Sequence, residues 1–214
     1  MWWKELEQIK AIFSTKNWFL SKKYMVETTC KINNGLDSNV LIDETEGKVI
    51  IGTGTKICSG AIIKGPIIIG KNCMIGNGAL IRGATVIGDN VRVGFASEIK
   101  ASIIENNVTI GPQCFIGDSK LECNVYLGAQ VRTSNHRLDK ENIKVFIAHH
   151  KYETGKEKLG CLIGKNSSLG IQVVILPGRI IEKNTTVGPK ILIEKNLPSG
   201  KYILKQQILF YPEV

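Results

Sequence analysis

Residues 69–93 read IGKNCMIGNGALIRGATVIGDNVRV, and the aliphatic residue that opens each group of six decides the fold. An aliphatic residue occupies every sixth position from Ile51 to Ile99, and glycine often follows it directly. The fourth position after the aliphatic is small or β-branched in most of these hexads, as in Thr55 and Ala61. Two single-residue slips and one longer break interrupt the phase, whose later members are Ile104, Ile110, Ile116, Leu121, Leu127, Ile163, Leu169, Ile175, Ile181 and Val187.

This period excludes an amphipathic helix, whose apolar residues recur at i, i+3, i+4 and i+7, and a simple strand, which alternates by two. A six-residue repeat with glycine in second place predicts a parallel β-helix, in which each hexad forms one flat side and a corner. We expect the aliphatic residue to stack on its equivalent one coil away, and the glycine to supply the positive φ of the corner. Cys73 and Cys114 hold inward places and are interpreted as core residues. At three hexads a turn, the pattern predicts about six coils.

The two ends of the chain are expected to cap the β-helix, because terminal coils expose strand edges. The sequence predicts an N-terminal helical cap or linker over 1–24, lying across the first coil, because apolar residues such as Trp3 recur there at helical spacing. A single-domain, all-β parallel β-helix over 25–190 follows, with an insert loop over 133–161. The segment 191–214 reads as a final strand or an extended arm.

Composition and charge narrow the class of partner. The chain has 214 residues and a net charge of +9, but its 28 Lys and Arg residues are scattered without a basic-aromatic stripe. No nucleic-acid partner is therefore expected, and small anionic ligands such as phosphates suit the charge equally well. The six cysteines form no C-x-x-C pair, no secretory signal opens the chain, and no apolar stretch has the length of a membrane span. We expect a cytoplasmic protein with free thiols and no membrane partner.

The break in the repeat, SNHRLDKENIKVFIAHHKYETGKEKLG over 134–160, contains every histidine of the chain: His136, His149 and His150. One interpretation is a solvated surface loop. The other is a binding face, because an unbroken prism offers a substrate no pocket and inserts on solenoids commonly form one. The three histidines lie in one irregular loop without the spacing of a metal site, so no metal is expected.

Several motifs carry a resemblance beyond the repeat: NGALIRGATVIGDNVRVGFASEIKASII over 77–104, IGDS over 116–119 and LPG over 176–178. Over roughly residues 1–205 the chain resembles the acetyltransferase half of the bifunctional sugar-1-phosphate nucleotidyltransferases, a branch of the hexapeptide acyltransferases. The resemblance implies a left-handed β-helix, a homotrimer, acetyl-CoA as acyl donor, and an amino-sugar phosphate such as glucosamine-1-phosphate, or a nucleotide sugar, as acceptor. No counterpart of the nucleotidyltransferase domain is present, so nucleotidyl transfer is not expected; a stand-alone relative and a truncated chain both remain open.

The resemblance assigns acceptor binding to Arg82 in LIRGAT, Lys100 in SEIKAS and Asn135 in TSNHRLD. Arginine and lysine would pair with phosphate oxygens, and asparagine with a hydroxyl. The alternative is that Arg82 and Lys100 are ordinary solvated corner residues.

Three insert lysines, Lys144 first and then Lys156 and Lys158, are further candidates for holding a phosphate of either substrate. The resemblance also places acetyl-CoA in a groove between neighbouring prisms near the last coils, where the candidate contacts are Gly170, Ile171 and Gly188.

The sequence departs from the family at the general base. Pro112 stands where the family has its base histidine, Phe115 where it has a tyrosine, and Tyr126 where it has a second asparagine. Because proline accepts no proton, His136 beside Asn135 becomes the candidate catalytic base, ahead of His149 and His150. The alternatives are a non-catalytic relative that binds a sugar nucleotide or partners a separate nucleotidyltransferase, and acyl transfer to an acceptor that needs less base.

Overall fold

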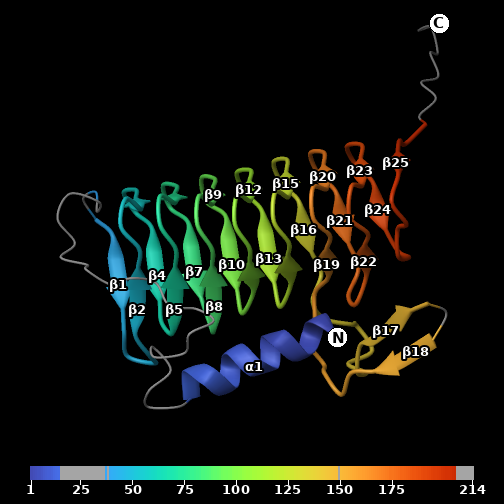
Figure 1. The fold of residues 1–214 in the computed structure, drawn as a ribbon, viewed down its shortest axis with the longest axis horizontal. Coiled ribbons are helices and arrows are strands. Elements are labelled where there is room, and N and C mark those ends of the chain that lie inside the picture. Colours follow the sequence, from blue (N-terminus) through green and yellow to red (C-terminus); the bar gives the residue numbers. More distant parts are fainter. Residues whose placement is uncertain (15–36, 38, 149, 206–214) are drawn as a thin grey trace, which may run out of the picture.

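The computed structural model describes residues 1–14, 37, 39–148 and 150–205, over which the chain winds into the expected left-handed parallel β-helix. Strands from successive coils pair in parallel and build three flat sheets of eight, seven and eight strands (Figure 1). His149, Cys30 and the stretch 15–24 of the predicted N-terminal helix lie outside the described residues.

The three sheets take their strands in turn along the chain. The first sheet contains β1 (Leu41–Asp43), β4 (Ile62–Lys64), β7 (Leu80–Arg82), β10 (Glu98–Lys100), β13 (Phe115–Gly117), β16 (Arg132–Thr133), β21 (Val174–Ile175) and β24 (Leu192–Ile193). The second contains β2 (Val49–Ile51), β5 (Ile67–Ile69), β8 (Thr85–Ile87), β11 (Ile103–Ile104), β14 (Lys120–Leu121), β19 (Leu162–Ile163) and β22 (Ile180–Ile181). The third contains β3 (Lys56–Ile57), β6 (Met74–Ile75), β9 (Arg92–Val93), β12 (Thr109–Ile110), β15 (Tyr126–Leu127), β20 (Ser168–Leu169), β23 (Thr186–Val187) and β25 (Lys201–Tyr202).

The core of the prism confirms the predicted phase. All of the phased aliphatic residues, from Ile51 to Val187, are buried. Equivalent residues pair directly between coils, as Ile63 does with Ile81. Cys73 and Cys114 are 3% and 2% exposed, which confirms them as core residues.

The predicted number of coils is wrong, because two of the sheets have eight strands each. The pattern misses coils at both ends: β1 precedes Ile51, while Ile193 and β25 follow Val187. It also misses one side of a coil in the middle, where the buried Thr133 fills an inward place that other coils give to an aliphatic residue.

The prediction that the hexad glycine supplies the positive φ of the corner is also wrong. Gly70, directly after Ile69, has no positive φ, but a Cβ on it would lie 2.5 Å from the carbonyl carbon of Gly88 in the next coil. Close stacking of the coils is therefore what excludes a side chain there. The left-handed residue comes two positions later, at Asn72 with φ of 54°.

The corner between the second and third sheets is here named the asparagine edge. In six consecutive coils its left-handed residue is an asparagine, a residue type that tolerates this conformation. Side-chain hydrogen bonds of 2.9–3.3 Å join these residues into a ladder from Asn90 to Asn184. The six residues of the edge are Asn72, Asn90, Asn107, Asn124, Asn166 and Asn184.

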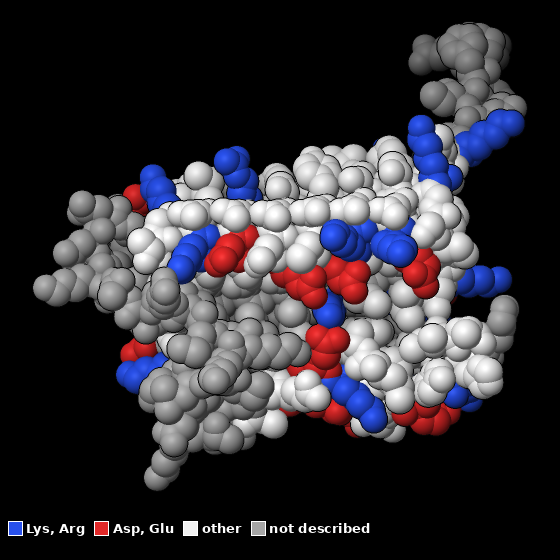
Figure 2. Space-filling view, in the orientation of Figure 1, with Lys and Arg blue, Asp and Glu red and all other residues white. Residues whose placement is uncertain are grey.

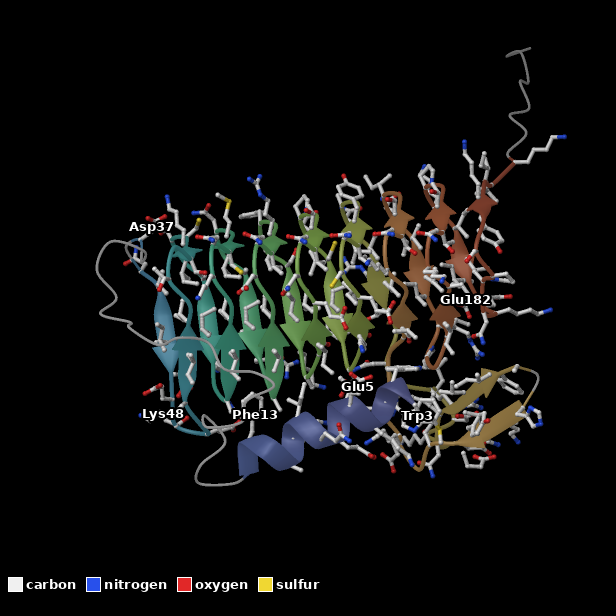
Figure 3. All side chains as sticks on the ribbon, viewed as in Figure 1. Trp3, Glu5, Phe13, Asp37, Lys48 and Glu182 are labelled. Carbon is white, nitrogen blue, oxygen red and sulfur yellow. The ribbon has the colours of Figure 1, made fainter. Side chains whose placement is uncertain are left out.

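The N-terminal helix α1 (Trp2–Ser14) lies along the outer face of the second sheet and not across the first coil (Figure 1). The outer residues of that sheet are apolar, and they pack against the apolar stripe of the helix. The residues in this contact are Trp2, Trp3, Leu6 and Ile9 from the helix and Ile68, Val86 and Ile103 from the sheet. Glu5 faces the β-helix (Figure 3), and one of its carboxylate oxygens lies 2.9 Å from Lys120 Nζ.

The insert leaves the β-helix as expected, and its middle part forms an antiparallel hairpin that the expectation of an irregular loop did not include. Its strands are β17 (Lys144–Ile147) and β18 (His150–Glu153). The hairpin lies beside the start of α1 (Figure 1), where the rings of Trp3 and Tyr152 have centroids 6.2 Å apart. Val145 is fully buried in the same apolar cluster, because the strand alternates an inward with an outward side chain.

The C-terminal segment begins as part of the β-helix. β25 pairs in parallel with β23, with Tyr202 opposite Val187, and residues 206–214 lie outside the described range. Among the described residues, no helix has the length and apolar character needed to cross a membrane.

Candidate functional site

Both one-residue slips and the insert fall on the same corner of the prism, between the first and second sheets, here named the insert edge. The slips shorten the corners after β10 and β13, where Ala101 and Asp118 have left-handed backbone, each with φ of 47°. Buried serines support these tight corners: Ser102 Oγ donates to Lys100 O at 2.8 Å, and Ser119 N donates to Ser102 Oγ at 3.1 Å. The irregular part of the sequence is thus gathered along one line of the structure.

The carboxylate of Asp118 is the centre of a charged cluster on this edge. Its side chain is 7% exposed, and its Oδ2 accepts a hydrogen bond from Asn135 Nδ2 at 2.8 Å and lies 3.7 Å from Lys100 Nζ. Lys10 of α1 approaches the other oxygen, Oδ1, at 3.8 Å. Two of the predicted acceptor-binding residues, Lys100 and Asn135, therefore meet, and they do so on a residue that the sequence analysis quoted in IGDS without assigning it a role.

Arg82, the third predicted acceptor-binding residue, is paired differently. It lies beside Lys100 in the register of β7 and β10, but its Nε donates to Glu98 Oε1 at 2.7 Å, and its Nη2 lies 2.7 Å from the same oxygen. The charge of Arg82 is thus largely engaged within its own sheet.

The insert closes onto the later coils through backbone contacts. Asn196 Nδ2 donates to Phe146 O at 2.7 Å, and Gly178 N donates to Gly160 O at 2.6 Å. A Cβ on Gly178 would lie 2.7 Å from Lys144 O, and its φ is 74°, so only glycine fits this contact without strain.

A cavity of about 730 Å³ lies between the insert and the corner that follows β21. This volume is within the range of roughly 300–1,000 Å³ that is typical of small-molecule sites. Its polar lining consists of Ser134, His136, Arg137, Asp139, Lys144 and Arg179, and its apolar lining of Leu138, Ile143, Phe146, Leu176 and Pro177.

The cavity brings together two residues that were predicted separately, His136 and Lys144. The main chain of His136 pairs with that of Lys158 as an isolated bridge, which holds its side chain at the cavity wall. Lys144 lies 3.8 Å from the exposed Glu153. Lys100, Asn135 and Arg82 do not line this cavity, so the predicted acceptor site divides into the Asp118 cluster and the insert cavity.

Arg179 is the residue of the cavity that the sequence analysis missed. Its Nε is buried and has no hydrogen-bond partner among the described residues. Burial lowers the pKa of the Arg179 guanidinium, and the nearby charge of Arg137 lowers it further. The sequence shows only an arginine directly after LPG, which by itself indicates neither burial nor an unpaired donor.

Other predicted residues of the insert lie away from the cavity. Lys156 Nζ forms an ion pair of 2.8 Å with Glu7 of α1, and so helps to hold the helix. His150 is exposed on β18, with its Nδ1 3.0 Å from Ala148 O.

The predicted acetyl-CoA contacts lie on the third corner, between the third and first sheets, here named the Pro112 edge. Gly170 and Gly188 occupy equivalent places after β20 and β23, and Ile171 is 45% exposed. Phe95, 56% exposed, lies on this edge three coils from Gly170 and four coils from Gly188. These residues are separated from His136 by the width of the first sheet.

The charged surface has no single dominant sign on the face in view: Figure 2 shows Lys and Arg interspersed with Asp and Glu. Within the described ranges, no group of three His, Cys, Asp or Glu side chains is placed to hold a metal ion.

Comparison with known proteins finds one matching family and several similar sequences. The family description of the GMPPB C-terminal domain matches residues 45–152. The uncharacterized acetyltransferase YaiX of Escherichia coli (strain 536) is 50% identical over 208 residues, which cover 97% of this chain and 89% of YaiX. The bifunctional protein GlmU of Methanococcus maripaludis (strain C7) is 38% identical over 208 residues, and the chain spans about half of its length, 48%.

Among solved structures, the UDP-N-acetylglucosamine acyltransferase from Campylobacter jejuni matches with a TM-score of 0.55 and 16% identity. The match covers 77% of this chain and 69% of that one. At this identity the likeness shows the fold, which agrees with the three-sheet prism described above.

Proposed function

The chain belongs to the hexapeptide-repeat acyltransferases, and on this premise we propose that it transfers an acetyl group from acetyl-CoA to the amine of an amino-sugar phosphate or nucleotide sugar. The observation that carries the proposal is the convergence of His136 and Lys144 on one cavity of ligand size. The name of a relative from Sulfurisphaera tokodaii, a bifunctional sugar-1-phosphate nucleotidylyltransferase/acetyltransferase that is 29% identical over 201 residues, supports a substrate of this class.

In this reaction the neutral amine attacks the thioester carbon, the new C–N bond forms, and the C–S bond breaks to release CoA. His136 takes the proton of the amine and returns a proton to the leaving thiolate. Its imidazole is exposed and can exchange protons with solvent. Lys144 attracts the anionic part of the acceptor. Lys100 and Asn135, held on Asp118, form the adjoining wall on the insert edge.

We propose that a homotrimer completes the site. The candidate acetyl-CoA contacts lie on the Pro112 edge and His136 lies on the insert edge, so one chain alone does not bring donor and acceptor together. A neighbouring copy that presents its Pro112 edge to the insert edge would do so. The exposed apolar side chains of Phe95 and Ile171 favour contact with another surface at that edge. Sedimentation equilibrium should give three times the chain mass of 23.6 kDa.

A second function, non-catalytic binding of a sugar nucleotide, is favoured by Pro112, which is exposed where the family has its base. The two functions differ in whether the chain releases CoA from acetyl-CoA at all. Only the enzymatic function needs His136 for that release.

The test is release of the CoA thiol from acetyl-CoA with glucosamine-1-phosphate and a panel of other amino sugars and nucleotide sugars. His136→Ala should lower kcat at least about 100-fold, because general bases contribute roughly 10²–10⁴-fold. The matched control is His150→Ala, since that histidine does not line the cavity. If no acceptor supports thiol release while a sugar nucleotide still binds, the non-catalytic function replaces the enzymatic one.

A further inference from the structure

The Nε–H of Arg179 is a donor that the described part of the chain leaves without an acceptor. Its Nε is buried without a hydrogen-bond partner, and no ion pair involves its side chain among the described residues. A buried donor that stays unpaired costs stability, so natural proteins rarely keep one without a reason. Arg179 also lines the insert cavity, where its positive charge can act on a bound anion although Nε itself is buried.

The other charges of the cavity do not neutralise Arg179. Asp139 is the acidic residue of the lining, and it forms an ion pair and hydrogen bonds with Arg137, which lower the pKa of Asp139 to about 2. Lys144 is 3.8 Å from Glu153, whose side chain is 61% exposed, so their attraction is weakened by solvent. Two positive charges, those of Arg179 and Lys144, are therefore available to a ligand.

We propose that the insert cavity binds a phosphate group of the acceptor, with the Arg179 guanidinium as its main ligand and the Lys144 ammonium as the second. Arginine offers two parallel N–H donors that match two phosphate oxygens, and two cations match the charge of a phosphate dianion. The apolar wall, including Phe146 and Pro177, limits the screening of this attraction by water. The inference deepens the proposed function, on which it rests for the identity of this cavity as the acceptor site.

This assignment moves the phosphate away from the residues that the family resemblance assigned to it. Arg82 is engaged with Glu98, and Lys100 lies on the carboxylate of Asp118, so each already has a partner of opposite charge. Arg179 has none in the described chain, and this difference is what places the phosphate in the insert cavity.

The experiment is titration calorimetry of the full chain with glucosamine-1-phosphate, UDP-glucosamine, inorganic phosphate and, as the ligand without phosphate, glucosamine. Wild type is compared with Arg179→Met, Arg179→Lys and the matched control Arg92→Met, which removes an exposed arginine on the outer face of the third sheet. Arg179→Met should raise the Kd of the ligands with phosphate by about 10- to 100-fold, in keeping with the loss of charged hydrogen bonds, and leave glucosamine unchanged. The Kd of Arg179→Lys should lie between those of wild type and Arg179→Met, because a lysine keeps the charge but lacks the two parallel N–H donors of arginine.

Glucosamine-1-phosphate tests a phosphate monoester, UDP-glucosamine a diphosphate, and inorganic phosphate the free ion. The ligand whose Kd rises in Arg179→Met identifies which kind of phosphate the cavity binds. The proposal is overturned if no phosphate-containing ligand binds wild type, if Arg179→Met binds them unchanged, or if Arg92→Met weakens them equally. Chemical denaturation of ligand-free Arg179→Met checks that this variant is folded, so that a raised Kd reports the loss of the guanidinium.

Turnover measured on the same variants separates this inference from the proposed function. Binding that depends on Arg179 without thiol release would leave the phosphate site standing and reject the reaction. Thiol release with a Kd that is independent of Arg179 would reject the phosphate site and leave the reaction standing.

Discussion

The asparagine edge and the insert edge are corners of the same prism, yet they satisfy their polar groups in opposite ways. On the asparagine edge the side chains from Asn90 to Asn184 bond to their equivalents in neighbouring coils, as Asn107 does to Asn124 at 3.2 Å. On the insert edge the corner residue changes from coil to coil, through Gly83, Ala101 and Asp118. Its polar groups find partners on other elements, or, in the case of Arg179, find none in the described chain.

The difference shows how a repeat protein separates folding from chemistry. A ladder of identical residues directs side-chain hydrogen bonds to neighbouring coils, so fewer of its donors and acceptors remain for a ligand. An edge that loses residues and accepts an insert cannot form such a ladder, so its charges remain available. The comparison therefore predicts that substitutions on the insert edge change function, whereas those on the asparagine edge change only stability.

The largest expected effect is that of Asp118→Asn. The substitution removes the charge that holds Lys100 and Lys10 while keeping the shape of the side chain. Displacing groups that orient a substrate can cost about 100-fold, so kcat/KM for acetyl transfer should fall by about two orders of magnitude. Steady-state kinetics with acetyl-CoA and the best acceptor would measure this.

The control for Asp118→Asn is Asn107→Gly on the asparagine edge, which should leave kcat/KM within about twofold because it touches no charged group. Equal loss of activity in the two variants would contradict the separation of the edges.

The next effect is that of Gly178→Ala, which tests how the insert closes on the coils. The added Cβ meets Lys144 O at 2.7 Å in a backbone with φ of 74°, so overpacking and left-handed strain act together and should cost about 2 kcal/mol of unfolding free energy. Because the displaced strand carries Lys144, acceptor affinity should fall as well. Urea denaturation and a binding titration measure the two losses; an unchanged value of either would show that the cavity wall does not depend on this contact.

The core of the fold could be predicted from the sequence because one hexad determines each flat side. The same reasoning undercounted the coils, since Thr133 carries no aliphatic signal although its methyl group and Oγ1 fill the inward place, where the hydroxyl accepts a hydrogen bond from Gly117 N at 2.8 Å. It also placed α1 wrongly, because the apolar outer face of the second sheet only becomes visible when residues 18 apart, such as Ile68 and Val86, are stacked.

The candidate site was predictable only in part. His136 and Lys144 could be chosen from the insert by their side-chain chemistry. Their convergence depends on the β17–β18 hairpin, which no periodicity in the sequence predicts. Arg179 was missed because burial without a partner is a property of packing and leaves no trace in a single sequence.

A smaller effect is expected on the asparagine edge from Asn107→Ala compared with Asn107→Gly. Both lose the ladder bonds, but only alanine must also adopt φ of 59°, so the alanine variant should be less stable than the glycine variant by about 1–2 kcal/mol. The difference in unfolding free energy between the two variants, measured by chemical denaturation, isolates the cost of the left-handed backbone. If the two variants are equally stable, the ladder and not the left-handed backbone explains why asparagine occupies this edge.

The smallest expected effect is on the pH dependence of stability, and it compares the thiol of Cys161 on the insert edge with that of Cys123 on the asparagine edge. Burial, opposed by a hydrogen bond with Ser119, raises the pKa of Cys161 at the end of the insert to about 12. Cys123 on the asparagine edge is only partly buried, and its pKa is also raised, by burial and by the neighbouring Glu105. Between the ordinary thiol pKa of 9.0 and about 12, the folded state keeps a proton that the unfolded chain loses, so stability must fall as pH increases through that window. From pH 7.5 to 9.5 this group should account for about 1 kcal/mol of the loss. Denaturation at the two pH values should show a weaker dependence for Cys161→Ala than for wild type or Cys123→Ala; an identical dependence in all three would mean that the insert does not seal this thiol from water.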